Sequence, residues 1–341
     1  MLMFANSQIE QLDCTEMEKL QLERLKKEIR WVCSKSSFYQ RKFAEAKVGV
    51  PDIKALSDIE KLPMTTKAEL ASVSAHELLT LPLSGILRIS KHGSLARYTH
   101  MYTGQDVAKN VEMLTRILVA HGITNASTVG VLWDMSDSRI LDVQCALEFI
   151  GAGVLLLGDD YDRADSLLRE FKMDALISDF RQVTQLIVHL QAQENVDGMI
   201  GAVVDELNTA DDFKVPLVLC FEENMHNPMR GYIERRLGAK VYSIFSSPEL
   251  GCAGAMFPCR ESSGLHVMED YYYPEIIEYG GDRVIREAGA VGELVLTTLA
   301  TEAMPIIRYR TGQTAMWIDD SCACGRSLRR IATPTEYYAS F

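Results

Sequence analysis

The sequence predicts an α/β fold, in which a mainly parallel sheet flanked by helices is followed by a C-terminal antiparallel β-subdomain. Between residues 101 and 245, short apolar runs alternate with amphipathic segments of helical length. That alternation is typical of parallel strands covered by helices on both faces. From residue 246 onward, strand-like runs follow one another with Gly and Pro turns and no helical segment between them. This second pattern predicts hairpins and therefore antiparallel pairing.

The first hundred residues are predicted to form helices that pack on this core. Apolar side chains recur at near-helical spacing among many charges over residues 15–46, which indicates one or two amphipathic helices. Pro51 and Pro63 bracket a short helical unit, and the stretch TTKAEL begins a further helix with Thr65 or Thr66 as its N-cap.

The α/β part is expected to alternate strands and helices along the chain. The strand-like runs are residues 127–133, 151–158, 174–179, 216–221 and 240–246, and the helical segments are 105–121, 138–150, 161–172, 180–194 and 226–237. We expect an N-terminal helical segment over residues 1–100, an α/β subdomain over 101–245, a β-subdomain over 246–331 and a tail over 332–341. No repeat or linker separates these parts, so they are expected to form one body.

Composition excludes several classes of function. The chain has 341 residues, 47% hydrophobic and 24% charged, which is typical of a globular protein. A net charge of −12 argues against nucleic acid or an anionic membrane surface as the main partner. No apolar run approaches the ~18 residues that span a bilayer, and the N-terminus does not resemble a signal peptide. We expect a cytoplasmic protein whose eight cysteines are reduced thiols or metal ligands.

Two arginines interrupt an apolar run near the C-terminus. In IIRYRTGQ, Arg308 and Arg310 stand two residues apart, which places them on one face of a strand. Buried charges need a partner of opposite sign, so the pair is expected to face a phosphate or a buried carboxylate. Ion pairs within the β-subdomain are an equally good interpretation.

Several segments resemble, in this order, the phenylacetate–CoA ligase branch of the adenylate-forming enzymes. SSFYQRKFAEAKVGVPDIKALSDIEKLPMTTKAEL resembles its N-terminal segment with the motif LP-x-T-T-K, and MRGYIERRLGAKVYSIFSSPELG resembles the approach to its Y-G-x-S/T-E motif. The segments GLHVMEDYYYPEIIE and GELVLTTLATEAMPIIRYRTG are the closest matches. The resemblance covers roughly residues 20–331.

In that family a carboxylic acid reacts with ATP to give an acyl-adenylate and pyrophosphate, and a thiol, usually coenzyme A, takes the acyl group. The resemblance implies that Glu249 binds Mg²⁺, for which a carboxylate is a suitable ligand. It implies that Arg310 and Arg308 contact phosphate and that Glu223, in FEEN, belongs to the segment lining the adenine pocket. It places the acyl or aryl pocket at Trp133, Asp134, Met135 and Phe245.

The chain departs from the family at the nucleotide motifs. Gln313 stands where the family has an aspartate that accepts hydrogen bonds from the ribose hydroxyls. Charged hydrogen bonds are worth roughly 1.5–3 kcal/mol against about 0.5–1.5 for neutral ones, so this change predicts about a tenfold loss of nucleotide affinity. The phosphate loop is about two residues short, although Lys91, His92, Gly93 and Ser94 are expected to contact an anion there.

The C-terminal lid of the family, with its catalytic lysine, is expected to be absent, because the chain ends ten residues after Ile331. We expect a degenerate relative that binds a small aryl or acyl carboxylic acid, with conventional ATP-dependent adenylation weakened or lost and with ATP and Mg²⁺ doubtful. Whether it is an enzyme stays open. The alternative is an active adenylate-forming ligase for an aromatic or small acid in a specialised biosynthetic pathway. Coenzyme A, a carrier protein, a partner enzyme and a homodimer stay open as partners.

Three cysteines and a histidine are candidate metal ligands: Cys259, His266, Cys322 and Cys324. The resemblance implies a structural zinc, since some members of the family bind one with this arrangement. Three thiolates and one imidazole satisfy tetrahedral Zn²⁺ without an open position. The alternative is a set of scattered thiols, because C-x-C is less diagnostic than paired C-x-x-C.

Overall fold

The computed structural model describes residues 4–92, 98–135, 137–198, 215–225, 227–261 and 263–335, with the side chains of 92 and 193–198 left out. The N-terminal part consists of helices, as predicted, followed by a two-stranded hairpin. Its elements are α1 (Ser7–Glu10), α2 (Cys14–Lys35), α3 (Ser37–Ala46), η1 (Val50–Asp52), η2 (Leu56–Lys61), α4 (Lys67–Ser72), α5 (Ala75–Leu78), η3 (Leu83–Gly85), β1 (Arg88–His92) and β2 (Tyr98–Tyr102).

The middle of the chain alternates helices and strands as the apolar pattern predicts. Its elements are α6 (Gly104–Ala120), β3 (Thr128–Val131), α7 (Arg139–Ile150), β4 (Gly153–Leu156), α8 (Tyr161–Glu170), β5 (Ala175–Ser178), α9 (Phe180–Gly198), β6 (Leu217–Glu222), α10 (Arg230–Leu237) and β7 (Lys240–Ser247). All five strands pair in parallel.

The last third forms antiparallel strands without a helix between them. These are β8 (Cys252–Pro258), β9 (Leu265–Val267), β10 (Tyr272–Ile277), β11 (Val284–Ile285), β12 (Gly292–Thr298), β13 (Tyr309–Ile318) and β14 (Arg330–Ala332). The predicted α/β fold class is confirmed.

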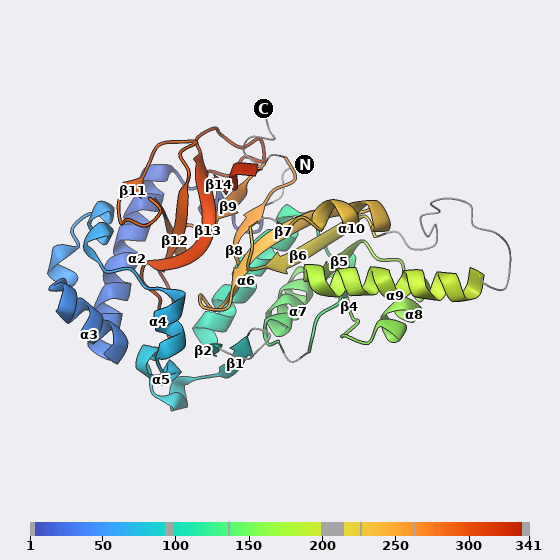
Figure 1. Cartoon of the computed structure of the whole chain (residues 1–341), viewed down its shortest axis with the longest axis horizontal. Coiled ribbons are helices and arrows are strands. Elements are labelled where there is room, and N and C mark those ends of the chain that lie inside the picture. The colour runs from blue at the N-terminus through green and yellow to red at the C-terminus, as the bar shows by residue number, and fades with distance from the viewer. Residues whose placement is uncertain are drawn as a thin grey trace.

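Both halves share one sheet of 12 strands, in the order β11-β10-β12-β13-β14-β9-β8-β7-β6-β5-β3-β4. The seam is β7, which pairs in parallel with β6 and antiparallel with β8. Figure 1 shows α2 and α3 beside the antiparallel end and α8 to α10 at the parallel end. The division at residue 246 stays a prediction, because hydrogen bonding continues across it.

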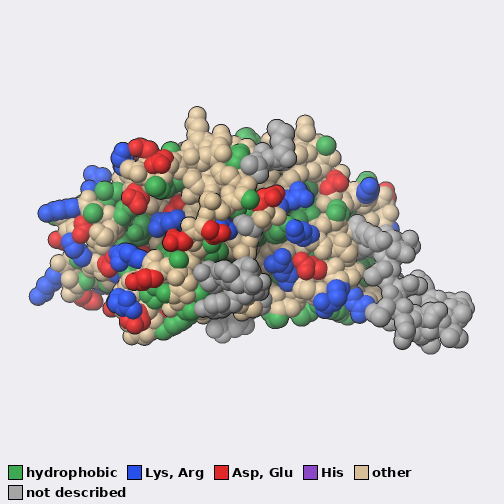
Figure 2. Space-filling model, turned by 90° about the horizontal axis from the view of Figure 1, so that it is seen from above, with side chains coloured by type: hydrophobic (Ala, Val, Ile, Leu, Met, Phe, Trp, Pro, Cys, Tyr) green, Lys and Arg blue, Asp and Glu red, His purple; other side chains and the backbone are tan. Residues whose placement is uncertain are grey.

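Alternate residues of the parallel strands enter two separate apolar cores. In β5, Ile177 belongs to the larger core, and Leu176 belongs to a second core under α8, α9 and α10. This alternation is what burial of both sheet faces requires. No helix in the described ranges is long and apolar enough to span a bilayer. Figure 2 shows acidic and basic side chains interspersed over one face.

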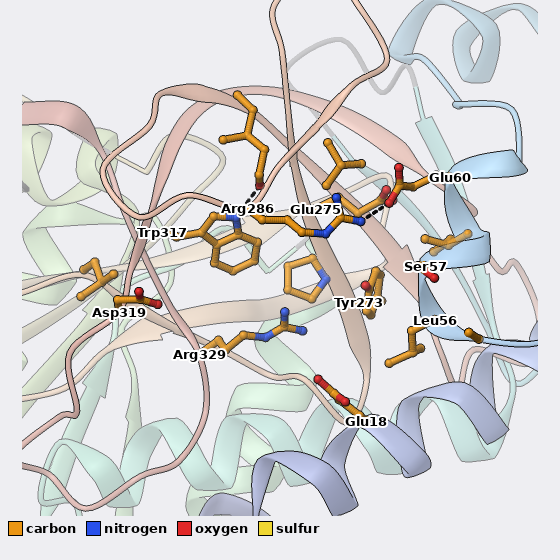
Figure 3. A pocket seen from close by; sticks show the side chains of 16 residues that line it. Glu18, Leu56, Ser57, Glu60, Tyr273, Glu275, Arg286, Trp317, Asp319 and Arg329 are labelled. Atoms are coloured by element: carbon orange, nitrogen blue, oxygen red, sulfur yellow. Dashed lines mark hydrogen bonds and ion pairs between the residues drawn. The ribbon is translucent and has the colours of Figure 1, made fainter.

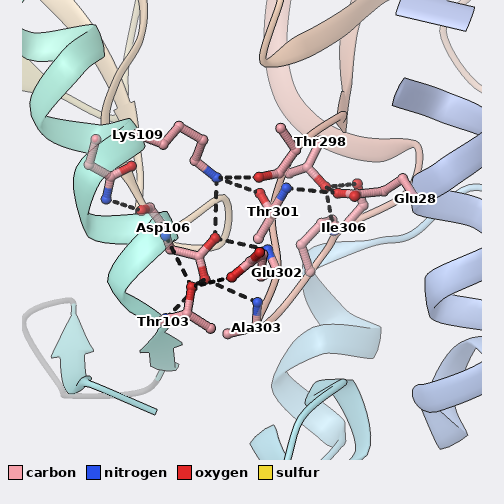
Figure 4. Close-up of polar contacts among 12 residues, drawn as sticks. Glu28, Thr103, Asp106, Lys109, Thr298, Thr301, Glu302, Ala303 and Ile306 are labelled. Carbon is pink, nitrogen blue, oxygen red and sulfur yellow. Dashed lines mark hydrogen bonds and ion pairs between the residues drawn. The ribbon is translucent and has the colours of Figure 1, made fainter. Parts of the chain in front are cut away.

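A buried polar junction joins α2 and α6 to the segment between β12 and β13 (Figure 4). Asp106 accepts hydrogen bonds from the backbone N–H groups of Glu302 and Ala303 at 2.9 and 3.0 Å. Glu28 accepts one from the Thr298 hydroxyl at 2.8 Å and one from Thr301 N–H at 3.1 Å. These contacts fix the chain just before the two arginines at 308 and 310.

Candidate functional site

Three charged side chains from distant parts of the chain meet at the carboxyl ends of β6 and β7. The Lys67 ammonium lies 3.1 Å from Glu249 Oε1 and 3.6 Å from Glu223 Oε2. Glu249, whose side chain is 7% exposed, also accepts a hydrogen bond from the Ser247 hydroxyl at 3.0 Å. Lys67 keeps 67% of its side chain exposed. We call Lys67, Glu223, Asn224, Glu249 and Gln313 the Lys67 site.

The electrostatics keep this site charged. Partial burial opposes protonation of Lys67, but Glu249 and then Glu223 outweigh it and raise the pKa of the lysine. Burial raises the pKa of Tyr309, and the neighbouring Glu249 adds to the effect, so the phenol stays protonated. A solvent-facing ammonium is suited to binding a phosphate oxygen. The buried carboxylate beside it is suited to binding a divalent cation.

Backbone hydrogen bonds hold Lys67 in place. Lys67 is the first residue of α4, and Thr66 caps that helix, with Glu69 N–H donating to the Thr66 hydroxyl at 3.2 Å. One residue earlier, Thr65 N–H donates to the Arg308 carbonyl at 2.8 Å, and Arg310 N–H donates to the Thr65 carbonyl at 2.9 Å. The start of α4 is therefore joined to the start of β13.

Arg308 forms a buried ion pair, which agrees with the ion-pair interpretation of the sequence, and its contact with phosphate stays a prediction. Its guanidinium pairs with Glu275 through bonds of 3.0 and 2.9 Å, and both side chains are 2% exposed. The same guanidinium donates to the carbonyls of Leu62 and Glu60 at 2.7 and 3.1 Å. Arg308 thus holds the segment leading into Lys67.

The two arginines also do not share a strand face as predicted. Arg308 precedes β13 and has a positive φ of 47°, which breaks the period of two. Arg310, in β13, pairs with Glu293 of β12 at 3.0 and 2.7 Å and keeps 23% of its side chain exposed. The ion-pair interpretation describes the observed partners of both residues, and a contact of Arg310 with phosphate stays a prediction.

Gln313 lies against the segment that follows β6. Its carbonyl oxygen accepts a hydrogen bond from Met225 N–H at 3.1 Å, and its NH₂ group donates to Asn224 Oδ1 at 3.4 Å. Gly312, with a φ of 72°, precedes it within an irregular part of the β12–β13 pairing. The structure thus brings Gln313 and the FEEN segment together as the resemblance implies, but one acceptor position of Gln313 is already used.

A cavity of about 650 Å³ adjoins the Lys67 site at the carboxyl ends of β5 and β6. Its lining includes Glu222, Glu223 and Asn224 from the end of β6, Thr184 and Gln185 from α9, and Arg139. In open α/β sheets, ligands bind outside the carboxyl ends of parallel strands. The volume falls in the range of small-molecule sites.

The four residues predicted to line the acyl pocket differ in solvent exposure. Trp133 and Phe245 are each 2% exposed, whereas Met135 is 52% exposed and Asp134 is half-buried. The Trp133 ring lies 5.4 Å from the ring of Phe221. None of the four predicted residues lines the 650 Å³ cavity.

Arg139 is the polar neighbour of this aromatic pair. Its guanidinium lies 5.4 Å from the centre of the Trp133 ring, pairs with Asp137 and donates to the Ser246 hydroxyl at 2.8 Å.

The predicted phosphate loop is only partly described. Lys91 lies in β1 and is exposed. The side chain of His92, and Gly93 and Ser94 entirely, lie outside the described residues. Their predicted contact with an anion stays a prediction.

Lys67 was missed as a functional residue, although the motif that contains it was recognised. The sequence does carry a signal. A lysine at the first position of a helix faces the positive end of the helix dipole, where a cation is unfavourable. Its presence there indicates carboxylate partners from elsewhere in the chain.

The four predicted metal ligands form one buried cluster. One ligand atom each from Cys259, His266, Cys322 and Cys324 lies within 4.8 Å of the others. The sulfurs of Cys259 and Cys322 are 3.4 Å apart, and Cys324 Sγ lies 3.3 Å from His266 Nε2. Hydrogen bonding from Cys324 lowers the pKa of Cys259, which favours the thiolate.

The surroundings of the cluster fit a metal site. His266 Nδ1–H donates to the Leu328 carbonyl at 3.1 Å, so Nε2 is the nitrogen that faces the cysteines. Such a hydrogen bond is usual for metal-binding histidines, because it fixes the tautomer and the ring orientation. Arg326 pairs with the fully buried Glu10 at 2.6 Å, so the cysteine-bearing loop also contacts α1.

A second cavity, of about 530 Å³, lies between η2 and the antiparallel strands (Figure 3). The guanidinium of Arg329 lies 5.3 Å from the Trp317 ring centre and 5.8 Å from that of Tyr273, and Arg286 pairs with Glu60 across the opening. Arg329 and Glu275 pair with residues outside the lining, Glu269 and Arg308 respectively. We therefore assign this cavity no ligand.

Comparison with solved structures shows that the chain has the fold of adenylate-forming ligases. The chain superimposes on 2-hydroxyisobutyryl-CoA ligase in complex with its adenylate with a TM-score of 0.82 and 21% identity, over 95% of this chain and 68% of that one. The structure of the same ligase with the adenylate and CoA in the thioesterification state gives a TM-score of 0.80 at 20% identity, over 98% and 74%. At this identity, the likeness establishes the fold.

Sequence relatives narrow the class. The chain is 28% identical over 329 residues to phenylacetate-coenzyme A ligase of Escherichia coli, covering 95% of this chain and 72% of the relative. It is 26% identical over 339 residues to the Thermus thermophilus enzyme of the same name, covering 96% and 72%. No family model matches the chain. The predicted resemblance is confirmed: the chain is similar to phenylacetate-coenzyme A ligases over almost its whole length, at 26–28% identity.

Proposed function

We propose that this chain binds a small aryl or acyl carboxylic acid together with ATP and Mg²⁺ at the Lys67 site and forms the acyl-adenylate. An oxygen of the acid attacks the α-phosphorus, a new P–O bond forms, and the bond to pyrophosphate breaks. Negative charge accumulates on the phosphate oxygens during this step, and a positioned cation stabilises it. The observation that carries the proposal is the ammonium of Lys67, held 3.1 Å from Glu249 and open to solvent.

Each residue has a role in this proposal. Lys67 contacts the reacting phosphate, and Glu249 would hold a Mg²⁺ ion, which would supply positive charge for the phosphate oxygens. Glu223, Asn224 and Gln313 line the side on which the nucleoside lies, next to the 650 Å³ cavity. Arg308 acts through Lys67 as a positioning residue, because it holds the carbonyls of Leu62 and Glu60.

A second candidate function is binding of the acid with adenylation weakened or lost. The observation that favours it is Gln313, a neutral side chain whose acceptor oxygen already bonds Met225 N–H. An amide in this position offers the ribose less than a free carboxylate does. The ionic partners of Arg308 and Arg310 inside the β-subdomain point the same way.

After adenylation, a thiol must receive the acyl group. Coenzyme A is the proposed thiol acceptor, since the curated relatives are named as coenzyme A ligases. A carrier protein is the alternative thiol acceptor, and a partner enzyme and a homodimer are further candidate partners. We further propose that the Cys259–His266–Cys322–Cys324 cluster binds a structural zinc ion, which would bind the C-terminal loop to β8 and β9.

The test combines calorimetric titration of ATP and Mg²⁺ with acid-dependent ATP–pyrophosphate exchange. We expect binding in the micromolar range and an exchange rate that falls about a hundredfold in Lys67→Ala. Glu249→Ala should weaken binding of the Mg²⁺–ATP complex. The matched control is Lys61→Ala, because Lys61 is also exposed and pairs with a carboxylate, Asp58, at 2.8 Å. No ATP binding at millimolar concentration would contradict adenylation and leave acid binding alone.

A further inference from the structure

The β1–β2 hairpin buries polar side chains on one face, and its other face is exposed along β1 but buried at Met101 of β2. On the outer face, Leu87 and Ile89 are 68% and 59% exposed. Alternate residues point inward, where Ser90, His100 and Tyr102 are 4%, 1% and 2% exposed. A strand pair usually buries apolar side chains, so the buried polar side chains of this hairpin need a reason.

The buried face of the hairpin contacts α6, α7 and the turn after β7. Arg88 pairs with Asp142 at 2.6 Å, and Asn110 Nδ2 donates to the Gly251 carbonyl at 3.0 Å and to Asp142 at 3.3 Å. A Cβ atom at position 251 would lie 2.1 Å from His100 Nε2, so this close approach requires glycine. We call these residues, with Ser90, Tyr98 and Ser138, the hairpin layer.

Four polar atoms of the hairpin layer are buried without a hydrogen-bond partner among the described residues. They are Ser90 Oγ, Tyr98 Oη, Asn110 Oδ1 and Ser138 Oγ. Folded proteins leave few such atoms, because an unmet hydrogen bond costs stability. Four in one layer indicate a polar ligand or ordered water between them.

The hairpin layer adjoins the Lys67 site. Gly251 follows Glu249 by two residues. Burial raises the pKa of Tyr98, with further contributions from Tyr39 and Glu249, so the Tyr98 phenol is a neutral donor near Glu249. If the carboxylate of the acid lies beside Lys67 and Glu249, its remaining atoms can extend toward this layer.

We propose that the hairpin layer binds the body of the substrate acid, and that this acid carries a hydrogen-bonding substituent, a hydroxyl or amino group, rather than a bare aryl or alkyl chain. This inference rests on the proposed function. Tyr98 donates to the substituent, and Ser90, Ser138 and Asn110 Oδ1 supply further partners. A site with unpaired polar groups disfavours an analogue that cannot pair with them.

The experiment compares acids that differ by one hydroxyl group. Mandelate is set against phenylacetate, and lactate against propionate, in ATP–pyrophosphate exchange. We expect kcat/KM for the hydroxylated acid to exceed that for its partner by about tenfold, the value of one buried hydrogen bond. In Tyr98→Phe, which keeps the ring, this preference should fall about tenfold through KM, with kcat unchanged. Ser90→Ala tests a second group at the same layer.

The control is Tyr232→Phe on α10, which removes a phenol hydroxyl from a half-buried surface position. Equal use of both acids in each pair, or an equal effect of Tyr98→Phe on both, would overturn the inference. If no acid supports exchange, the proposed function fails, and calorimetric titration with the acids alone then decides the inference. Binding of only the hydroxylated members supports it, and binding of both or of neither overturns it.

Discussion

The Arg308–Glu275 pair and the Lys67 site use charged side chains in opposite ways. Arg308 and Glu275 are each 2% exposed and pair with each other, and Arg308 also donates to two backbone carbonyls. At the Lys67 site, an ammonium that is 67% exposed stands between two carboxylates. Buried charges with matched partners maintain the fold, whereas a solvent-facing charge held by its neighbours can bind a ligand. The predictions below test this distinction.

The largest effect is expected from replacing one residue of the buried cysteine–histidine cluster. Replacing Cys324 by Ser should remove one zinc ion per chain and cost on the order of 5 kcal/mol of folding stability, since metal binding contributes directly to folding. Zinc content by plasma emission and thermal unfolding measure the two effects. Cys145→Ser, at an exposed cysteine, is the control. Native protein purified without zinc and with unchanged stability would contradict the assignment.

Breaking the buried ion pair should have the next largest effect. Arg308→Ala leaves Glu275 buried without its cation and should cost about 3–5 kcal/mol in denaturant unfolding. Arg310→Ala breaks a pair whose two bonds go to the same oxygen of Glu293 and whose side chains are 23% and 11% exposed, and it should cost about 1 kcal/mol. If Arg310→Ala destabilises the protein as much as Arg308→Ala does, burial is not what separates structural from accessible charge.

Glu28 is a buried acid in the junction of Figure 4. The pH dependence of folding stability therefore tests what burial of this carboxyl group costs. Burial raises its pKa to about 8 in the folded protein, from an ordinary value of 4.5. Between these pH values the folded state binds more protons than the unfolded state, so stability falls as pH rises.

Glu28→Gln should remove this pH dependence. We expect similar stability to the native protein at pH 5 and a gain of roughly 4 kcal/mol at pH 9, measured by denaturant unfolding at both values. Glu112→Gln, at a glutamate on α6 whose side chain is 34% exposed, is the comparison variant. An equal gain at both pH values would show that the effect is not the titration of Glu28.

The smallest effect is expected at the nucleoside side of the Lys67 site. Gln313→Asp restores an ionised acceptor and should tighten ATP binding by about tenfold in calorimetric titration. Gln313→Asn has the length of aspartate without its charge and separates the two contributions. Unchanged affinity in Gln313→Asp would place the ribose elsewhere.

Much of this protein follows from local sequence patterns. The alternation of apolar runs and helical segments predicted β3 to β7 and α6 to α10, and Gly and Pro turns predicted the antiparallel strands. Periodicity succeeds here because each strand is buried on faces that its own residues define. The four zinc-ligand candidates, Cys259, His266, Cys322 and Cys324, were likewise identifiable, because few side chains bind that metal.

Other features were decided only by tertiary contacts. Nothing in IIRYRTGQ shows that Arg308 turns to Glu275 while Arg310 turns to Glu293, since the partners lie 33 and 17 residues away. Lys67 becomes a candidate active-site residue only because Thr65 pairs with the start of β13 and brings it to Glu249. The sequence by itself determined which residues form strands and helices, because local spacing encodes these, and it identified the four side chains of the cysteine–histidine cluster as candidate metal ligands. The tertiary structure alone decided which charges are matched and which remain open, because charge pairing depends on distances across the whole fold.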